Sequence, residues 1–221
     1  MKTVIFDLDG TLADTSGDLI AAANHCFRAA GHGDMLDPAL DKGTALKGGR
    51  AMLRLGFGRL HGTADEAEVD RWYVPLLEAY GENIDTHTRL YPGAEENITK
   101  LLDRGYFVGI CTNKPERLAE ELMSRLGVRD LFGSLVGADT LPVRKPDAAP
   151  YVAAVTRAGG QVASSLLVGD TDTDRSTARA AGVPSLLVTF GPDGNDVSAL
   201  RPEGLLESYD LLQVRVQELI G

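Results

Sequence analysis

The first dozen residues constrain the fold of this chain more than any other stretch. Residues 2–11 read KTVIFDLDGT, an apolar run that ends abruptly in two carboxylates and a glycine. Residues two apart on a β-strand face the same side, so Asp7 and Asp9 leave the strand end in one direction while Leu8 points into the core. Like charges this close repel unless a cation joins them, and a hard cation with oxygen ligands suits them. We therefore expect a central strand with a divalent-cation site at its end.

Two other local structures could account for the same residues. Asp9-Gly10 could form a tight hairpin, but a hairpin needs alternating apolar residues on both sides, and residues 19–30 (LIAAANHCFRAA) predict a helix. A calcium loop starting at Asp7 would need glycine and glutamate where the sequence has Leu12 and Asp18. Both alternatives fit poorly, so the later motifs decide the meaning of this one.

The remainder of the chain divides into a helical stretch and an alternating stretch. Helices without a strong strand are predicted up to residue 90, over residues 12–30, 38–46, 49–60 and 65–80. Short apolar strands then alternate with helices, and we expect these strands at residues 107–111, 135–137, 165–168 and 185–190. Residues 191–204 predict a loop before a last helix at 211–220.

This pattern predicts an α/β fold: a Rossmann-like three-layer core with a parallel sheet and a small all-helical cap domain inserted after the first strand. The core would comprise residues 1–14 and 91–221. The cap would comprise residues 15–90.

Charge and cysteine content limit the partners and the compartment. The chain has 32 acidic and 22 basic residues, a net charge of -10, which disfavours nucleic acid or an anionic membrane surface as a partner. Cys26 and Cys111 form neither a disulfide framework nor a zinc motif. We find no signal-peptide pattern and no run of the ~18 apolar residues that a membrane helix needs. We expect a cytoplasmic protein, monomeric or homodimeric.

Two polar motifs follow the second and third predicted strands, at the edge where parallel sheets bind ligands. Thr112 and Asn113 offer a hydroxyl, an amide and backbone N–H groups to an anion, although either could instead cap the next helix. Lys145 is either an ordinary solvated lysine or a fixed cation for a negatively charged site at this edge, where a cation would keep a carboxylate such as Asp7 ionised. The neighbouring Lys114 is expected to be solvated, and Arg144, beside Lys145, to face solvent or the cap.

A fourth motif, GDTDTD at residues 169–174, follows the fourth predicted strand. Its alternating aspartates imitate the start of a calcium loop. Arg175 and Ala181, however, stand where that loop needs its turn glycine and its bidentate glutamate.

Taken in order, the four motifs resemble those of the haloacid dehalogenase-like superfamily. The resemblance implies that Asp7 is a nucleophile and Asp9 a general acid and base, and the second aspartate favours phosphoryl transfer over dehalogenation. It also implies Mg²⁺ held by the carboxylates of Asp7 and Asp170 and by the Asp9 backbone carbonyl. The implied supporting residues are Thr112, Asn113 and Lys145 on the phosphate oxygens and Asp174 outside the metal ligands, with no role for Asp172.

Substrate selection would then fall to the helical cap. Its sequence Lys47-Gly48-Gly49-Arg50 carries two cations that suit a second negative group such as a carboxylate, or that are ordinary surface charges. Residues 91–93 (YPG) and 137–146 (GADTLPVRKP) resemble bacterial phosphoglycolate phosphatases, which implies 2-phosphoglycolate, a small anionic phosphate monoester.

Three alternatives stay open at this point. The first is a phosphatase acting on a sugar phosphate, pyrophosphate or an amino-sugar phosphate. The second is an enzyme like β-phosphoglucomutase, which Thr11 disfavours because such mutases often carry valine there. The third is a non-catalytic phosphate-binding protein, although such a protein has little need of paired aspartates.

Overall fold

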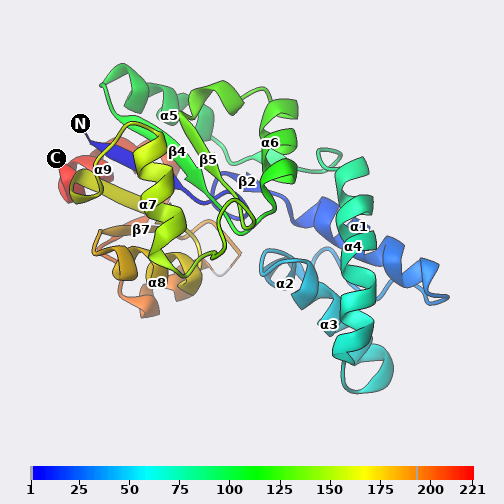
Figure 1. Ribbon diagram of the computed structural model, residues 1–221. Helices are drawn as coiled ribbons and strands as arrows, with labels where there is room; N and C mark the ends of the chain where they lie inside the picture. Colours follow the sequence, from blue (N-terminus) through cyan, green and yellow to red (C-terminus); the bar gives the residue numbers. More distant parts are fainter. Residues whose placement is uncertain (1, 193) are drawn as a thin grey trace. The chain divides into compact units, whose positions relative to one another are not determined.

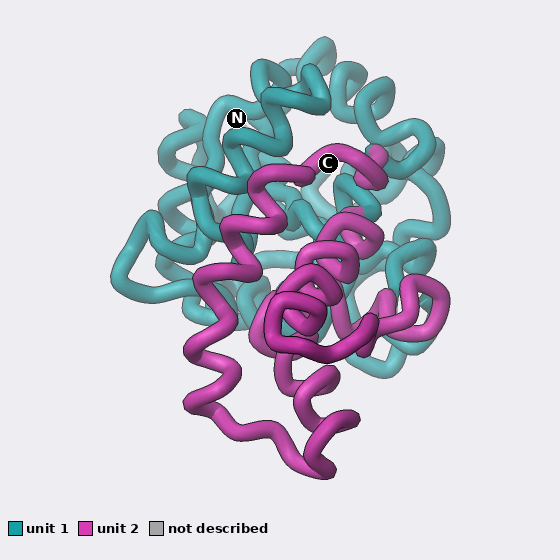
Figure 2. Tube along the Cα trace, turned by 90° about the vertical axis from the view of Figure 1, so that its right-hand side faces the viewer, with its two compact units in different colours: residues 1–14, 90–221 teal, residues 15–89 magenta. Residues whose placement is uncertain are grey.

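The computed structural model describes residues 2–192 and 194–221. The chain forms two compact units, one of residues 1–14 and 90–221 and the other of residues 15–89 (Figure 2). The expected division differs from this one at Leu90, which belongs to the first unit. Among the described residues, no helix combines the length and the apolar character needed to cross a membrane.

The first unit is built on a parallel sheet of six strands in the order β5-β4-β1-β6-β7-β8 (Figure 1). On strand β1, Thr3 lies opposite Phe107 of β4 on one side and opposite Ser165 of β6 on the other. β1 is therefore an interior strand, as predicted. The strands are β1 (Thr3–Phe6), β4 (Phe107–Cys111), β5 (Ser134–Val136), β6 (Ser165–Gly169), β7 (Ser185–Val188) and β8 (Gly204–Leu206).

Helices cover both faces of this sheet, because its strands are apolar on both sides. Helices α7 and α8 pack together and bury a cluster that includes Ile5, Val136, Tyr151 and Leu167. Helices α5 and α9 pack together against the other face, which gives the expected three-layer α/β core. The helices of this unit are α5 (Ala94–Asp103), α6 (Glu116–Arg125), α7 (Ala148–Arg157), α8 (Asp172–Ala181) and α9 (Leu212–Ile220).

The second unit has its own helical core. Phe27 and Phe57 meet edge to face with ring centroids 5.1 Å apart, and the Phe27 ring occupies the space that a side chain at Gly56 would need. The buried carboxylate of Asp18 accepts hydrogen bonds from the backbone N–H groups of His87 and Thr88, which fixes the end of the unit to its first helix. The helices are α1 (Ser16–Ala29), α2 (Lys42–Ala45), α3 (Gly49–His61) and α4 (Glu66–Glu82).

Three sequence predictions of secondary structure were wrong. The first helix begins at Ser16 and not at residue 12, since residues 13–14 form the short strand β2 (Ala13–Asp14), which pairs with β3 (Arg89–Leu90). The helix expected over 38–46 spans only α2. The tail is not a plain loop, because it contains a 3-10 helix and ends in β8, whose Leu206 is fully buried.

Candidate active site

The backbone after β1 brings Asp7 to the carboxyl end of the sheet and turns sharply behind it. The Asp7 backbone N–H donates to the Val168 carbonyl oxygen of β6 at 2.8 Å, which continues the ladder to the strand end. Gly10 has φ = 83°, in the region that favours glycine. A Cβ at Gly10 would collide with the carboxylate of Asp170, so the glycine permits this close approach.

A buried lysine joins two of the predicted carboxylates. Lys145 Nζ donates to Asp7 Oδ1 at 2.8 Å and to Asp174 Oδ1 at 2.6 Å, and its side chain is only 2% exposed. Burial alone would lower the pKa of Lys145, but Asp174 and Asp7 raise it above its ordinary value. The lysine is therefore a permanent cation at the strand ends.

Burial also shifts the carboxyl groups. It raises the pKa of Asp7 to about 6, although Lys145 acts in the opposite direction. Burial likewise raises the pKa of Asp170 well above its usual range, and the nearby charges of Asp174 and Asp7 add to the shift. A further positive charge near these carboxyl groups would favour their ionised form.

Asp7, Asp170 and Asp174 form an acidic cluster, and their carboxylate oxygens differ in the hydrogen bonds that they accept. Asp7, Asp170 and Asp174 each offer an oxygen, and these atoms lie within 4.8 Å of one another. Asp170 Oδ1 accepts from Thr11 Oγ1 at 2.9 Å, while its buried Oδ2 has no hydrogen-bond partner among the described residues. Asp174 is engaged on both oxygens, by Lys145 on one and by Thr171 and the Asp170 N–H on the other.

This arrangement fits a hard divalent cation. An orphaned buried carboxylate oxygen on Asp170 beside the Asp7 carboxylate is the kind of oxygen donor that Mg²⁺ takes. Asp174, whose oxygens are already hydrogen-bonded, would support this pair from outside, since it holds Lys145 and the loop after β6.

The raised carboxyl pKa values predict how a cation affects stability. Asp7 has a pKa of about 6 in the folded protein and about 3.9 when unfolded, so its ionisation costs stability above about pH 6, and the cost disappears as the pH falls towards about 4. Mg²⁺ would remove this cost. We expect Mg²⁺ to raise the melting temperature by several degrees at about pH 7.5 and by less at about pH 5.

Two variants make the Mg²⁺ measurement specific to the site. Asp170→Asn should abolish most of the shift, whereas Asp172→Asn, at an exposed position two residues later at the start of α8, should retain it. An equal Mg²⁺ response in all three proteins would contradict the proposed ligands.

The motif after β4 lies beside Lys145. Thr112 is buried, its N–H donates to the Val136 carbonyl oxygen at 2.9 Å, and Asn113 Nδ2 donates to the Lys145 carbonyl oxygen at 3.1 Å. The alternative interpretation of these residues as helix caps is wrong, because Pro115 occupies the N-cap position of α6. Asn113 thus connects the second motif to the backbone of the third.

The structure corrects the expectation for Lys114. Its side chain is 4% exposed, not solvated, and its Nζ donates to Asp9 Oδ1 at 2.8 Å. The sequence offered one indication that Lys114 belongs to the site, namely its position directly after Thr112-Asn113 at a strand end. Nothing in the local pattern indicated that its side chain is buried. Arg144 is exposed, as expected, and Asp172 is an exposed residue at the start of α8.

Unlike the core motifs, Lys47 and Arg50 belong to the helical unit. Lys47 is exposed between α2 and α3. Arg50 pairs with Asp70 and lies over the ring of Tyr73, 4.4 Å from its centroid, so its charge already has partners within that unit. Their part in substrate selection stays a prediction.

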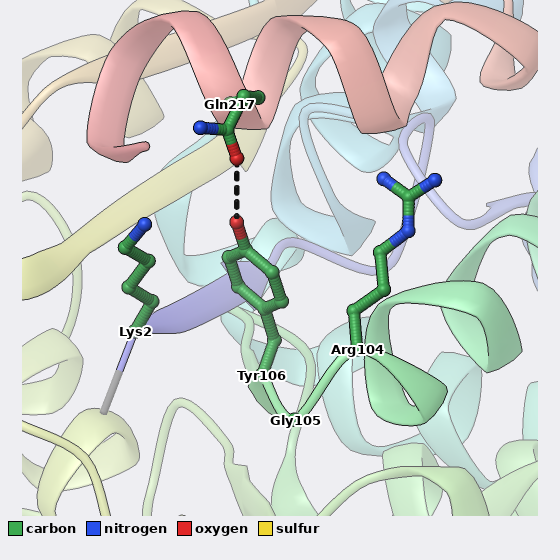
Figure 3. A pocket seen from close by; sticks show the side chains of 5 residues that line it. All are labelled: Lys2, Arg104, Gly105, Tyr106 and Gln217. Atoms are coloured by element: carbon green, nitrogen blue, oxygen red, sulfur yellow. Dashed lines mark hydrogen bonds between the residues drawn. The ribbon is translucent and has the colours of Figure 1, made fainter.

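A hollow of about 390 Å³ lies at the opposite end of the sheet and contains none of the predicted catalytic groups (Figure 3). Lys2 and Tyr106 directly precede β1 and β4, so they mark the amino ends of these strands. Tyr106 Oη donates to Gln217 Oε1 of α9 at 3.5 Å across the hollow. None of the described residues that line this hollow is a carboxylate, so they include neither a nucleophile nor a metal ligand of the predicted kind. The other lining residues are Arg104 and Gly105.

Sequence comparison relates the chain to one protein family and to individual relatives along nearly its whole length. The family described as haloacid dehalogenase-like hydrolase matches residues 4–188. A phosphoglycolate phosphatase of Mesorhizobium japonicum is 37% identical over 215 residues, which cover 97% of this chain and 94% of the relative. A phosphoglycolate phosphatase of Agrobacterium fabrum is 36% identical over 210 residues, covering 94% and 89%.

Solved structures share the fold at lower sequence identity. The crystal structure of a predicted phosphoglycolate phosphatase from Haemophilus somnus is similar with a TM-score of 0.84 at 24% identity, covering 97% of this chain and 98% of that one. A predicted phosphatase from Clostridium acetobutylicum is similar with a TM-score of 0.76 at 19% identity, covering 99% of each chain. At these identities the likeness concerns the fold alone.

Proposed function

Because this chain belongs to the haloacid dehalogenase-like hydrolase family, we propose that it is a magnesium-dependent phosphatase that forms an aspartyl phosphate on Asp7. Its relatives over nearly the whole chain are phosphatases, and the chain is a phosphoric monoester hydrolase. The observation that carries the mechanism is the position of Asp7, buried between the ammonium of Lys145 and the orphaned oxygen of Asp170.

In the first step, an Asp7 carboxylate oxygen attacks the phosphorus in line with the leaving oxygen. The bond from phosphorus to the leaving oxygen breaks, and Asp9 donates a proton to that oxygen. Lys145 keeps Asp7 ionised and stabilises the negative charge on the transferring phosphoryl group. Thr112 and Asn113 would hold the remaining phosphate oxygens.

In the second step, Asp9 accepts a proton from a water molecule that attacks the phosphorus of the aspartyl phosphate. The bond between phosphorus and the Asp7 oxygen breaks, which releases phosphate and restores the carboxylate. Asp9 is suited to both steps because it follows Asp7 by only two residues and is less buried than Asp7.

Mg²⁺, when bound by the Asp7 and Asp170 carboxylates and the Asp9 backbone carbonyl, would neutralise charge on the phosphate oxygens. Thr11 fixes one oxygen of Asp170 and leaves the other for this purpose. Asp174 positions Lys145 and the loop that carries Asp170.

We further propose 2-phosphoglycolate as the substrate. The names of the relatives support this choice. The sequence predicts that Lys47 and Arg50 of the helical unit bind the substrate's carboxylate, but Arg50 already pairs with Asp70.

The test is phosphate release, with and without Mg²⁺, from 2-phosphoglycolate, sugar phosphates, pyrophosphate and an amino-sugar phosphate. We expect release to require Mg²⁺ and kcat/KM to be at least about tenfold higher for 2-phosphoglycolate than for the others. Faster release from another monoester would refute the substrate, while release that persists after chelation of divalent ions would refute the metal dependence.

A further inference from the structure

Each of the two carboxylates after β1 has a buried lysine of its own. Lys145 Nζ is bonded to Asp7 Oδ1 and Lys114 Nζ to Asp9 Oδ1, both at 2.8 Å. The two lysines come from different segments, Lys114 from the loop after β4 and Lys145 from the loop after β5. Their side chains are 4% and 2% exposed, respectively, so both charges lie inside the unit.

The two lysines face different parts of a phosphate monoester. On the proposed function, Asp7 bonds to phosphorus and Asp9 protonates the leaving oxygen, so Lys145 serves the phosphoryl group and Lys114 lies on the leaving-group side. A general acid lies within about 3 Å of the oxygen that it protonates, and the Lys114 ammonium is 2.8 Å from Asp9 Oδ1, so the leaving oxygen would lie within about 8 Å of this ammonium whichever Asp9 oxygen carries the proton.

An ammonium at this place favours a leaving group that carries a negative charge. It has three N–H donors, so it can bond to Asp9 and to another acceptor at the same time. In an enclosed site its attraction for an anion is stronger than in water. A carboxylate attached through one methylene to the leaving oxygen is short enough to reach it, whereas a neutral leaving group lacks a charge to match the ammonium.

We propose that Lys114 determines specificity by binding an anionic group on the leaving group, which makes short phosphoryloxy carboxylates the substrate class. This inference rests on the proposed function and deepens it. It places recognition of the carboxylate in the unit that performs the chemistry, through a residue that the sequence did not single out.

The experiment compares two substrates of the same length that differ in charge. They are 2-phosphoglycolate and 2-hydroxyethyl phosphate, and kcat/KM is measured for both with the unmodified protein and with Lys114→Gln. We expect the unmodified protein to favour 2-phosphoglycolate by about a hundredfold or more, and Lys114→Gln to reduce this ratio to within about tenfold. Lys100→Gln, which removes an exposed lysine paired with Glu96 on α5, should leave the ratio unchanged.

The ratio separates recognition from a purely structural role. If Lys114 only held Asp9 in place, Lys114→Gln would slow both substrates by the same factor and preserve the ratio, which would overturn the inference. Lys114→Met keeps the volume of the buried stem and repeats the test if the glutamine variant does not fold. Failure of the proposed function looks different, because the unmodified protein itself would then release phosphate from neither compound.

Discussion

Replacing Asp7 with asparagine is expected to abolish phosphate release, lowering kcat by about ten-thousandfold or more. An amide cannot attack phosphorus, yet its oxygen can still accept the hydrogen bond that Lys145 donates to Asp7. The variant also removes a buried group that ionises at a cost, so the metal-free protein should unfold at no lower temperature than the unmodified protein at neutral pH.

The measurement is single-turnover phosphate release with Mg²⁺ present, together with the melting temperature. Asp172→Asn, which changes an exposed aspartate in the fourth motif, is the matched control and should retain normal turnover. Turnover of Asp7→Asn within about tenfold of normal would rule out Asp7 as the nucleophile. Normal biological activity without turnover would instead favour the non-catalytic phosphate-binding protein.

Replacing Lys145 with methionine is expected to damage catalysis and stability together. Lys145 is the shared cation of Asp7 and Asp174, so its loss leaves two buried carboxylates facing each other. Removing one partner of a buried ion pair costs about 3–5 kcal/mol in the free energy of unfolding. Loss of the charge that stabilises the transferring phosphoryl group should lower kcat by about a thousandfold.

Urea unfolding and turnover of the Lys145→Met variant give the two measurements. The loss of stability should be larger at about pH 7.5 than at about pH 5, because the carboxyl group of Asp7, with a pKa of about 6, binds a proton at the lower pH. Arg144→Met changes the exposed neighbour and should alter neither quantity. A Lys145→Met protein as stable as the Arg144→Met protein would contradict the buried ion-pair network.

The sequence predicted the parts of the site that lie directly at strand ends. Asp7, Thr112 and Asp170 each follow a buried apolar run, and a parallel sheet brings such ends to one edge. That these residues meet at the carboxyl edge follows from the parallel strands alone. It can therefore be predicted without knowing how the side chains pack.

Other features depend on contacts that no local pattern contains. Lys114 is buried where its ammonium pairs with Asp9, a residue 105 positions away in the sequence. Strand β8 consists of only Gly204–Leu206 and owes its structure to pairing with β7. The helix expected over 38–46 is short because Asp41 accepts from Arg59 and from the Asp37 N–H, contacts that favour a turn before Lys42.

The pairing of β1 has a consequence for synthesis of the chain on the ribosome. Thr3 lies between Phe107 and Ser165, so the first strand to emerge must wait for partners made much later. Until then Asp7 has neither Lys145 nor Asp170 beside it. A growing chain truncated before β6 therefore contains the proposed nucleophile but no assembled site, and activity should begin only when the segment through Asp174 has left the exit tunnel.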